Sequence, residues 1–168
     1  MENRFLIWPI FIDPETGECS VPDAILRAIW TRLWNEDKIR HLFWGGTVRT
    51  FEAFKDHLLS PLYKPCLVVD TVKQDVVFLA WLSDFGDGFA FGHFCAIGKY
   101  QRHAGEEILK YWRELRILIV IGITPENNGK ALKLTRILGF KEVGTIPSMC
   151  NMAYEAKRVG GTITCIEL

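Results

Sequence analysis

The chain has 168 residues, of which 49% are hydrophobic, so it can bury one substantial core but is short for two domains. Its 20 basic and 20 acidic residues balance, and no apolar run approaches the ~20 residues that span a bilayer. The five cysteines are widely spaced without a CxxC pair, which is typical of free thiols in a reducing compartment. We therefore expect one cytoplasmic domain, residues 1–168, that binds neither nucleic acid nor membranes.

The first quarter of the chain predicts a strand followed by a helix. Residues 5–11 are apolar and β-rich, but the run is short, contains Pro9 and lacks a basic start, so it reads as a strand rather than an export signal. Pro22 and Asp23 then open a helix. Its apolar residues recur every three or four positions and predict a buried stripe that includes both tryptophans: Ile25, Leu26, Ile29, Trp30, Leu33 and Trp34.

The middle of the chain predicts a second helix and three strands. Thr50 is a suitable N-cap for a helix that Pro61 ends. Residues 66–72, 76–82 and 89–97 are rich in β-formers, and the connections between them are short. Short connections of this kind predict an antiparallel meander.

The last third alternates between helices and strands. A helix is expected from about Ala104, and the uniformly apolar residues 117–124 predict a strand covered on both faces. Pro125 begins another helix that Gly139 closes, and residues 141–146 and 162–167 read as final strands. The whole order predicts an α/β fold with a mixed, mostly antiparallel central sheet flanked by helices.

Two motifs in this second half carry a resemblance to a known family. The longer one has Asn128 and Ala131 at a helix start, then Gly139-Phe140, and a glycine at Gly144. This run resembles the corresponding segment of the GNAT superfamily of N-acyltransferases. The resemblance implies a GNAT-like fold for the single domain and places Asn128 beside bound acetyl-CoA.

The second motif follows the strand that ends at Ile97. GNAT proteins have Arg or Gln five residues after this strand, opening the pattern Arg/Gln-x-x-Gly-x-Gly/Ala, and Arg102 and Gly105 fit it. Glu107 stands where the family has Gly or Ala, and Glu106 adds a second carboxylate. Backbone N–H groups at such a helix start can cradle a pyrophosphate, whereas carboxylates there can equally stabilise an ordinary capped helix.

The resemblance implies where acetyl-CoA, as cosubstrate, contacts the chain. Pantetheine pairs with the backbone of the central strand like an added strand, and the pyrophosphate rests on the following turn. The residues so implied are Cys95, Ala96, Ile97, Arg102, His103, Ala104, Gly105, Glu106 and Glu107. The partner molecules are then acetyl-CoA and an amine whose identity the sequence does not give.

Candidates for the catalytic groups are few. Histidine titrates near neutrality, and His93 shares a strand with the pantetheine contacts, so it is a candidate base, although a histidine on a strand more often serves only in packing. Thr135 stands where GNAT enzymes often have a tyrosine that protonates the leaving thiolate. Trp30, Trp34 and Trp44 could instead line an acceptor pocket. His/Cys spacing indicates no zinc site, and Ala131 after Gly129-Lys130 excludes a nucleotide P-loop.

Three functions stay open at this point. The first is an acetyl-CoA-dependent N-acyltransferase. The second is a catalytically inactive GNAT-like binding or assembly protein, similar in its compact, aromatic-rich composition to proteins of bacteriophages. The third is an unrelated α/β protein, which would lack a splayed pair of strands between residues 89–97 and 117–124. A homodimer is one alternative for the oligomeric state.

Overall fold

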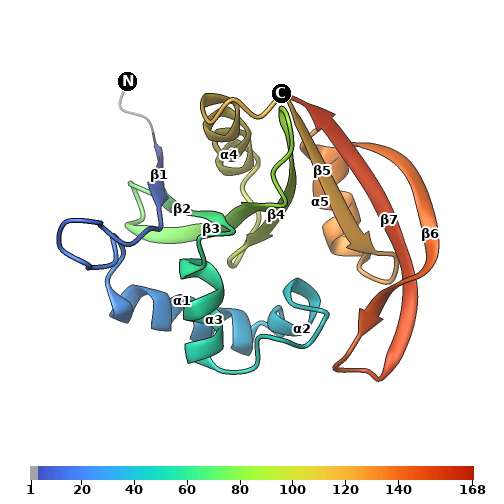
Figure 1. The fold of residues 1–168 in the computed structure, drawn as a ribbon, viewed down its shortest axis with the longest axis horizontal. Helices are drawn as coiled ribbons and strands as arrows, with labels where there is room; N and C mark the ends of the chain where they lie inside the picture. Colours follow the sequence, from blue (N-terminus) through green and yellow to red (C-terminus); the bar gives the residue numbers. More distant parts are fainter. Residues whose placement is uncertain (1–3) are drawn as a thin grey trace.

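A computed structural model describes residues 4–168 as a seven-stranded sheet in the order β1-β2-β3-β4-β5-β7-β6 (Figure 1). The strands are β1 (Phe5–Pro9), β2 (Lys64–Asp70), β3 (Asp75–Ser83), β4 (Phe89–Ala96), β5 (Ile119–Pro125), β6 (Lys141–Met152) and β7 (Lys157–Glu167). The helices are α1 (Asp23–Asn35), α2 (Ile39–Leu42), α3 (Phe51–Leu59), α4 (Arg102–Glu114) and α5 (Gly129–Ile137). Apart from the short helix α2, the order confirms the predicted succession of strands and helices.

Neighbouring strands pair antiparallel except β4 and β5, which pair parallel. The predicted meander is therefore confirmed as β2, β3 and β4, because hairpin connections force successive strands to run in opposite directions. The long β6–β7 hairpin forms the far edge of the sheet (Figure 1). The fold class predicted from the sequence is thus confirmed.

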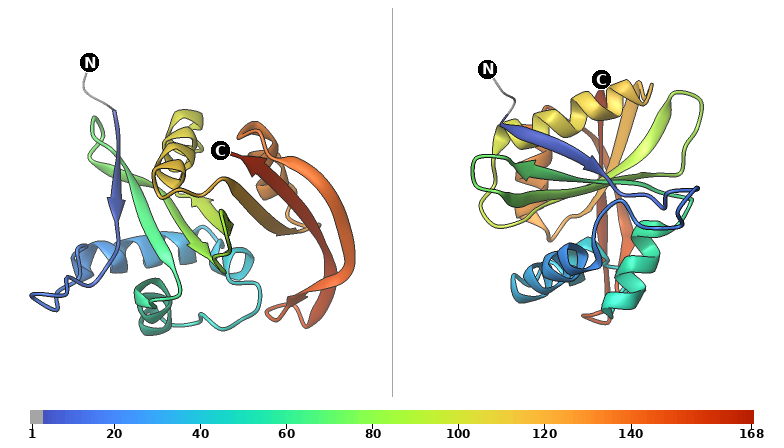
Figure 2. Two further views of the ribbon diagram at one scale, coloured as in Figure 1. Left: turned by 45° about the horizontal axis from the view of Figure 1, so that its top comes forward. Right: turned by 90° about the vertical axis from the view of Figure 1, so that its left-hand side faces the viewer.

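Helices cover both faces of the sheet. Figure 2 shows α4 on one face and α1 with α3 on the other. Trp112 and Ile108 of α4 belong to one apolar cluster, which also takes in Leu138 after α5, whereas Leu26 and Leu33 of α1 belong to the second. Side chains alternate across each strand, so one strand serves both clusters.

Side-chain caps and a glycine set the helix ends as the sequence predicts. The Thr50 hydroxyl accepts a hydrogen bond from the N–H of Ala53 at 3.2 Å and begins α3. Asn128 caps α5 in the same way, through the N–H of Ala131. Gly139 ends that helix with a φ of +93°, a left-handed conformation that favours glycine. Across residues 4–168, the helices lack the length and apolar character needed to cross a bilayer.

Two element predictions in the second half are wrong. Pro125 is the last residue of β5 rather than the start of a helix, because its carbonyl accepts the Asn128 N–H in a turn that places the cap three residues later. Residues 117–124 are not covered on both faces either. Ile119 is 41% exposed while Val120 is buried, since only alternate side chains point into the core.

Two further differences lie on the α1 side. Trp34 is 53% exposed rather than core, because it lies on the flank of the stripe formed by Leu26, Ile29 and Leu33. The short helix α2 was not predicted from the sequence. Only Ile39 of its four residues is buried, so its apolar pattern is too short to indicate a helix.

Candidate functional site

The parallel strands β4 and β5 pair over only part of their lengths. Their register contains three pairs, Phe89 with Ile119, Ala90 with Val120 and Phe91 with Ile121. Both strands continue beyond these pairs, to Ala96 and Pro125, and Figure 1 shows them side by side at one end and apart at the other. This divergence is the splayed pair of strands that an unrelated α/β protein would lack.

The divergence leaves backbone groups of β4 without a strand partner. Ile97 donates its N–H to the Val77 carbonyl on β3, and on the opposite edge the Gly88 carbonyl accepts from Ile119 on β5. Because backbone groups alternate between the two edges of a strand, Phe94 and Ala96 direct theirs toward the side that β5 has left. Within the predicted stretch 95–97, Ala96 therefore faces the divergence and Ile97 faces β3.

A segment after α1 lies against this end of β4. Lys38 Nζ donates to the Ala96 carbonyl at 2.6 Å and also forms an ion pair with Glu36. Glu36 Oε2 accepts from the N–H of Gly98 at 3.1 Å, in the turn that leads to α4. Sequence reasoning missed both contacts because they join residues about 60 positions apart.

His93 lies two residues beyond the last β4–β5 pair and takes part in a hydrogen-bonded chain. Its Nε2 is 3.0 Å from Ser83 Oγ, and Ser83 donates its hydroxyl hydrogen to Asp84 Oδ2 at 2.8 Å. A hydroxyl has one hydrogen, so Nε2 must be the donor to Ser83, and a neutral His93 then has its free lone pair on Nδ1. The ring stacks on Trp81 at 5.0 Å.

The protonation states near this strand follow from burial. Desolvation lowers the pKa of His93 to about 4, with a smaller contribution from the nearby His57, so its imidazole is neutral at physiological pH. Burial also raises the pKa of the Cys95 thiol to about 11. Cys95 is therefore a poor nucleophile, because the reactive form of cysteine is the thiolate. His93 can therefore accept a proton at neutral pH, although a pKa of about 4 makes it a weak base.

The start of α4 borders a hollow of about 410 Å³. Arg4, Gln101 and the predicted residues Arg102, His103, Glu106 and Glu107 are among its lining. The N–H groups of Ala104 and Gly105 turn back to the Gln101 carbonyl. The N–H groups at the first two positions of the helix, Arg102 and His103, have no carbonyl one turn earlier in the helix to bond.

The side chains at this helix start are paired with each other. Glu106 accepts from Arg102 Nε and contacts His103 Nδ1, both at 2.8 Å, and the hydrogen bond with His103 is the main cause of its lowered pKa. Gly105 is buried against α5, since a Cβ there would lie 2.6 Å from Leu138. Packing against Leu138 therefore already requires a glycine at this position. From the sequence motif, we had expected Gly105 to let the backbone come close to a phosphate.

The two predicted residues of α5 are engaged within that helix. Thr135 is 4% exposed and its hydroxyl donates to the Leu132 carbonyl at 2.9 Å. A threonine hydroxyl is too weak an acid to replace the tyrosine of the family, and the hydrogen of Thr135 is already engaged in this bond. Asn128 uses its Oδ1 as the helix cap, which leaves its amide NH₂ group to donate.

The architecture and the divergence together define the fold of the GNAT N-acetyltransferases, as the sequence motifs predict. A spermidine N-acetyltransferase from Vibrio cholerae, solved with CoA and spermine, superposes with a TM-score of 0.74 at 14% identity, covering 98% of this chain and 95% of that one. A ribosomal-protein-S5-alanine acetyltransferase from Vibrio fischeri gives 0.69 at 13% identity, covering 99% and 94%. No protein-family model and no curated sequence matches the chain, and no comparison supports the likeness to bacteriophage proteins.

Proposed function

We propose that the protein is an acetyl-CoA-dependent N-acetyltransferase that transfers an acetyl group to an amine. The divergence of β4 and β5 carries this proposal, because it leaves the N–H groups of Phe94 and Ala96 without a neighbouring strand, so that they can pair with pantetheine. The start of α4 then lies at the end of β4, where its N–H groups suit a pyrophosphate. Asn128, at the start of α5, flanks the diverging end of β5.

Acetyl transfer requires the protein to position the two substrates and to supply one base. His93 Nδ1 accepts the proton of the acceptor's ammonium group, and the neutral amine attacks the thioester carbonyl. A β4 N–H facing the divergence stabilises the oxyanion that develops. The C–N bond forms, the nitrogen gives its second proton to water, the C–S bond breaks, and the thiolate of CoA leaves and takes up a proton from water.

The backbone contact can be tested at Ala96. We expect Ala96→Pro to weaken acetyl-CoA binding about tenfold, because it removes one hydrogen bond and adds bulk at the divergence. The thermal midpoint should change little, since the Ala96 N–H is not part of the β3–β4 ladder. Ile97→Pro removes the N–H that donates to the Val77 carbonyl, so this variant should clearly lower the thermal midpoint. Equal affinity of Ala96→Pro and wild type in calorimetry would contradict the assigned contact.

The charges at the helix start give a second test. We expect Glu106→Gln to strengthen acetyl-CoA binding two- to fivefold at low salt, roughly the free energy of an exposed ion pair, because Arg102 and His103 are released from a competing carboxylate. Salt should reduce the gain. Glu114→Gln, at the other end of α4, removes the same charge and serves as the control. The role of the turn is refuted if both variants gain equally or Glu106→Gln binds more weakly.

A second function, a GNAT-like binding protein without catalysis, is favoured by two contacts. Lys38 already occupies the Ala96 carbonyl, and Glu106 engages both Arg102 and His103 at the start of α4. This alternative predicts that the protein releases no thiol from acetyl-CoA with any amine. Amine-dependent thiol release that is lost in a His93 variant separates the two.

A further inference from the structure

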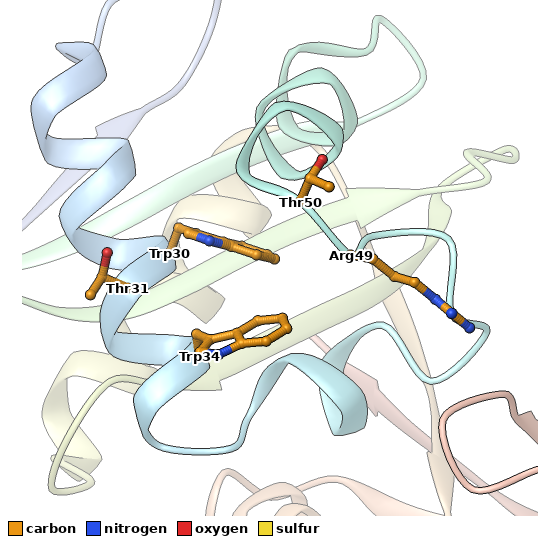
Figure 3. Close-up of a pocket in the computed structure, with 5 residues that line it drawn as sticks. All are labelled: Trp30, Thr31, Trp34, Arg49 and Thr50. Carbon is orange, nitrogen blue, oxygen red and sulfur yellow. The ribbon is translucent and has the colours of Figure 1, made fainter.

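The last turns of α1 are held between two parts of the molecule. Figure 3 shows Trp30 and Trp34 on the flank of α1 that faces the segment leading into α3, where they border a hollow of about 240 Å³. Three aromatic rings in contact with one another separate this hollow from His93, namely those of Phe54, Phe43 and Trp81. On the opposite flank, Arg32 pairs with Asp75 at the start of β3, at 2.6 Å. The end of α1 is therefore a fixed support for the residues that follow it.

The segment that follows, residues 36–38, makes two contacts with the end of β4 and the turn after it. Lys38 Nζ donates to the Ala96 carbonyl at 2.6 Å, and Glu36 Oε2 accepts from the Gly98 N–H at 3.1 Å. Lys38 and Glu36 are also ion-paired, and their side chains are only 28% and 30% exposed. A partly shielded ammonium group and a carboxylate thus bind this segment to the strand that carries the proposed cosubstrate site.

Lys38 occupies a backbone group that pantetheine would use. A ligand that pairs with a strand like an added strand bonds both the N–H and the carbonyl of the residues that face it. The Ala96 N–H has no neighbouring strand, but the Ala96 carbonyl already accepts a charge-assisted hydrogen bond from Lys38. Such a bond is roughly twice as strong as one from a neutral amide, so pantetheine must displace the ammonium group to pair fully with β4.

We propose that Lys38, held by Glu36, is an autoinhibitory latch that closes the Ala96 carbonyl in the free protein and must open before acetyl-CoA binds. The latch rests on the proposed function, because it closes the same acetyl-CoA site. It can open without movement of the backbone, since the ammonium group stands on a flexible four-carbon stem. Leu33 and Ile39 are buried before and after the segment and keep its backbone in place. The apparent Kd of acetyl-CoA is then raised in proportion to the fraction of molecules that are closed.

Lys38→Met tests the latch, because methionine keeps most of the apolar stem but has neither the charge nor the donor. We expect this variant to bind acetyl-CoA about three- to tenfold more tightly than the wild type in calorimetry, as expected when one competing hydrogen bond is removed. The sign is decisive, because loss of a positive charge would by itself weaken the binding of a polyanion. Lys38→Arg keeps a cationic donor and should bind nearer to the wild type. Lys55→Met, which removes a lysine paired with Asp23 at the start of α1, is the matched control and should bind as wild type.

The thermal midpoint without ligand gives a second readout. Lys38→Met should unfold at a slightly lower temperature than the wild type, since the free protein loses a contact, and yet bind acetyl-CoA more tightly. A lysine with a merely structural role would lower the midpoint without raising the affinity. Equal or weaker binding by Lys38→Met would overturn the latch and leave the proposed function standing. Absence of binding in both the wild type and Lys38→Met at millimolar acetyl-CoA would refute the cosubstrate site itself, and the latch with it.

Discussion

Replacing His93 by Gln is expected to lower kcat for acetyl transfer by about 10²- to 10⁴-fold, the usual contribution of a positioned general base. Glutamine keeps a donor for the Ser83 hydroxyl but has no atom that titrates. The affinity for acetyl-CoA should be unchanged, because the proposed contacts use the backbone of Phe94 and Ala96 rather than the His93 side chain. The measurement is thiol release from acetyl-CoA with a panel of primary amines.

The pH dependence adds a readout that a purely structural role would not give. Burial holds the pKa of His93 at about 4, below its usual 6.5, so the imidazole is neutral throughout the neutral range. The acid limb of the rate profile should therefore lie near pH 4, and Ser83→Ala, which removes the partner of Nε2, should shift it. His103→Gln, on the surface of α4, is the control. Full activity of His93→Gln would refute the assignment.

Trp112→Ala is expected to cost about 3–5 kcal/mol of unfolding free energy, the range typical of truncating a large buried aromatic side chain. Trp112 is 0% exposed and lies where α4 packs on the sheet behind β4. Its ring contacts that of Phe94 at 6.4 Å, and a Cβ on Gly92 would lie 3.0 Å from it. The side chain therefore supports the strand that carries the proposed site.

Urea unfolding of Trp112→Ala and Trp112→Phe measures this effect. The phenylalanine variant should lose less than half as much stability, because it keeps an aromatic ring and removes an indole N–H that is buried without a hydrogen-bond partner among residues 4–168. Lys110→Ala, exposed on the same helix, is the control. A loss below about 1 kcal/mol in Trp112→Ala would contradict the packing of α4 against β4.

Those parts of the fold that depend on local chemistry could be predicted from the sequence. The caps at Thr50 and Asn128 and the stop at Gly139 each involve contacts within a few residues, so the residue type indicates the structure. The prediction at Pro125 was wrong because proline is common at the first position of a helix, whereas here it ends β5 and precedes the turn to α5. Trp34 was wrongly predicted to be buried, because the spacing of apolar residues does not show where the buried stripe of a helix ends.

The candidate site was harder to predict because its parts are distant in sequence. The motif after Ile97 indicated the start of α4, but not that Glu106 would hold both Arg102 and His103. The Ser83–Asp84 partner of His93 was missed for the same reason, since the β3–β4 register decides which side chains meet. The sequence did contain one signal for this contact, because the polar residues Ser83 and Asp84 follow directly on an apolar run.

Calorimetric titration of acetyl-CoA into the wild-type protein, with Ala96→Pro beside it, tests the central claim most directly. We predict one saturable site in the wild type and binding about tenfold weaker in the variant at an unchanged thermal midpoint. Absence of binding to the folded wild-type protein at millimolar acetyl-CoA would contradict the claim that the divergence of β4 and β5 is a cosubstrate site.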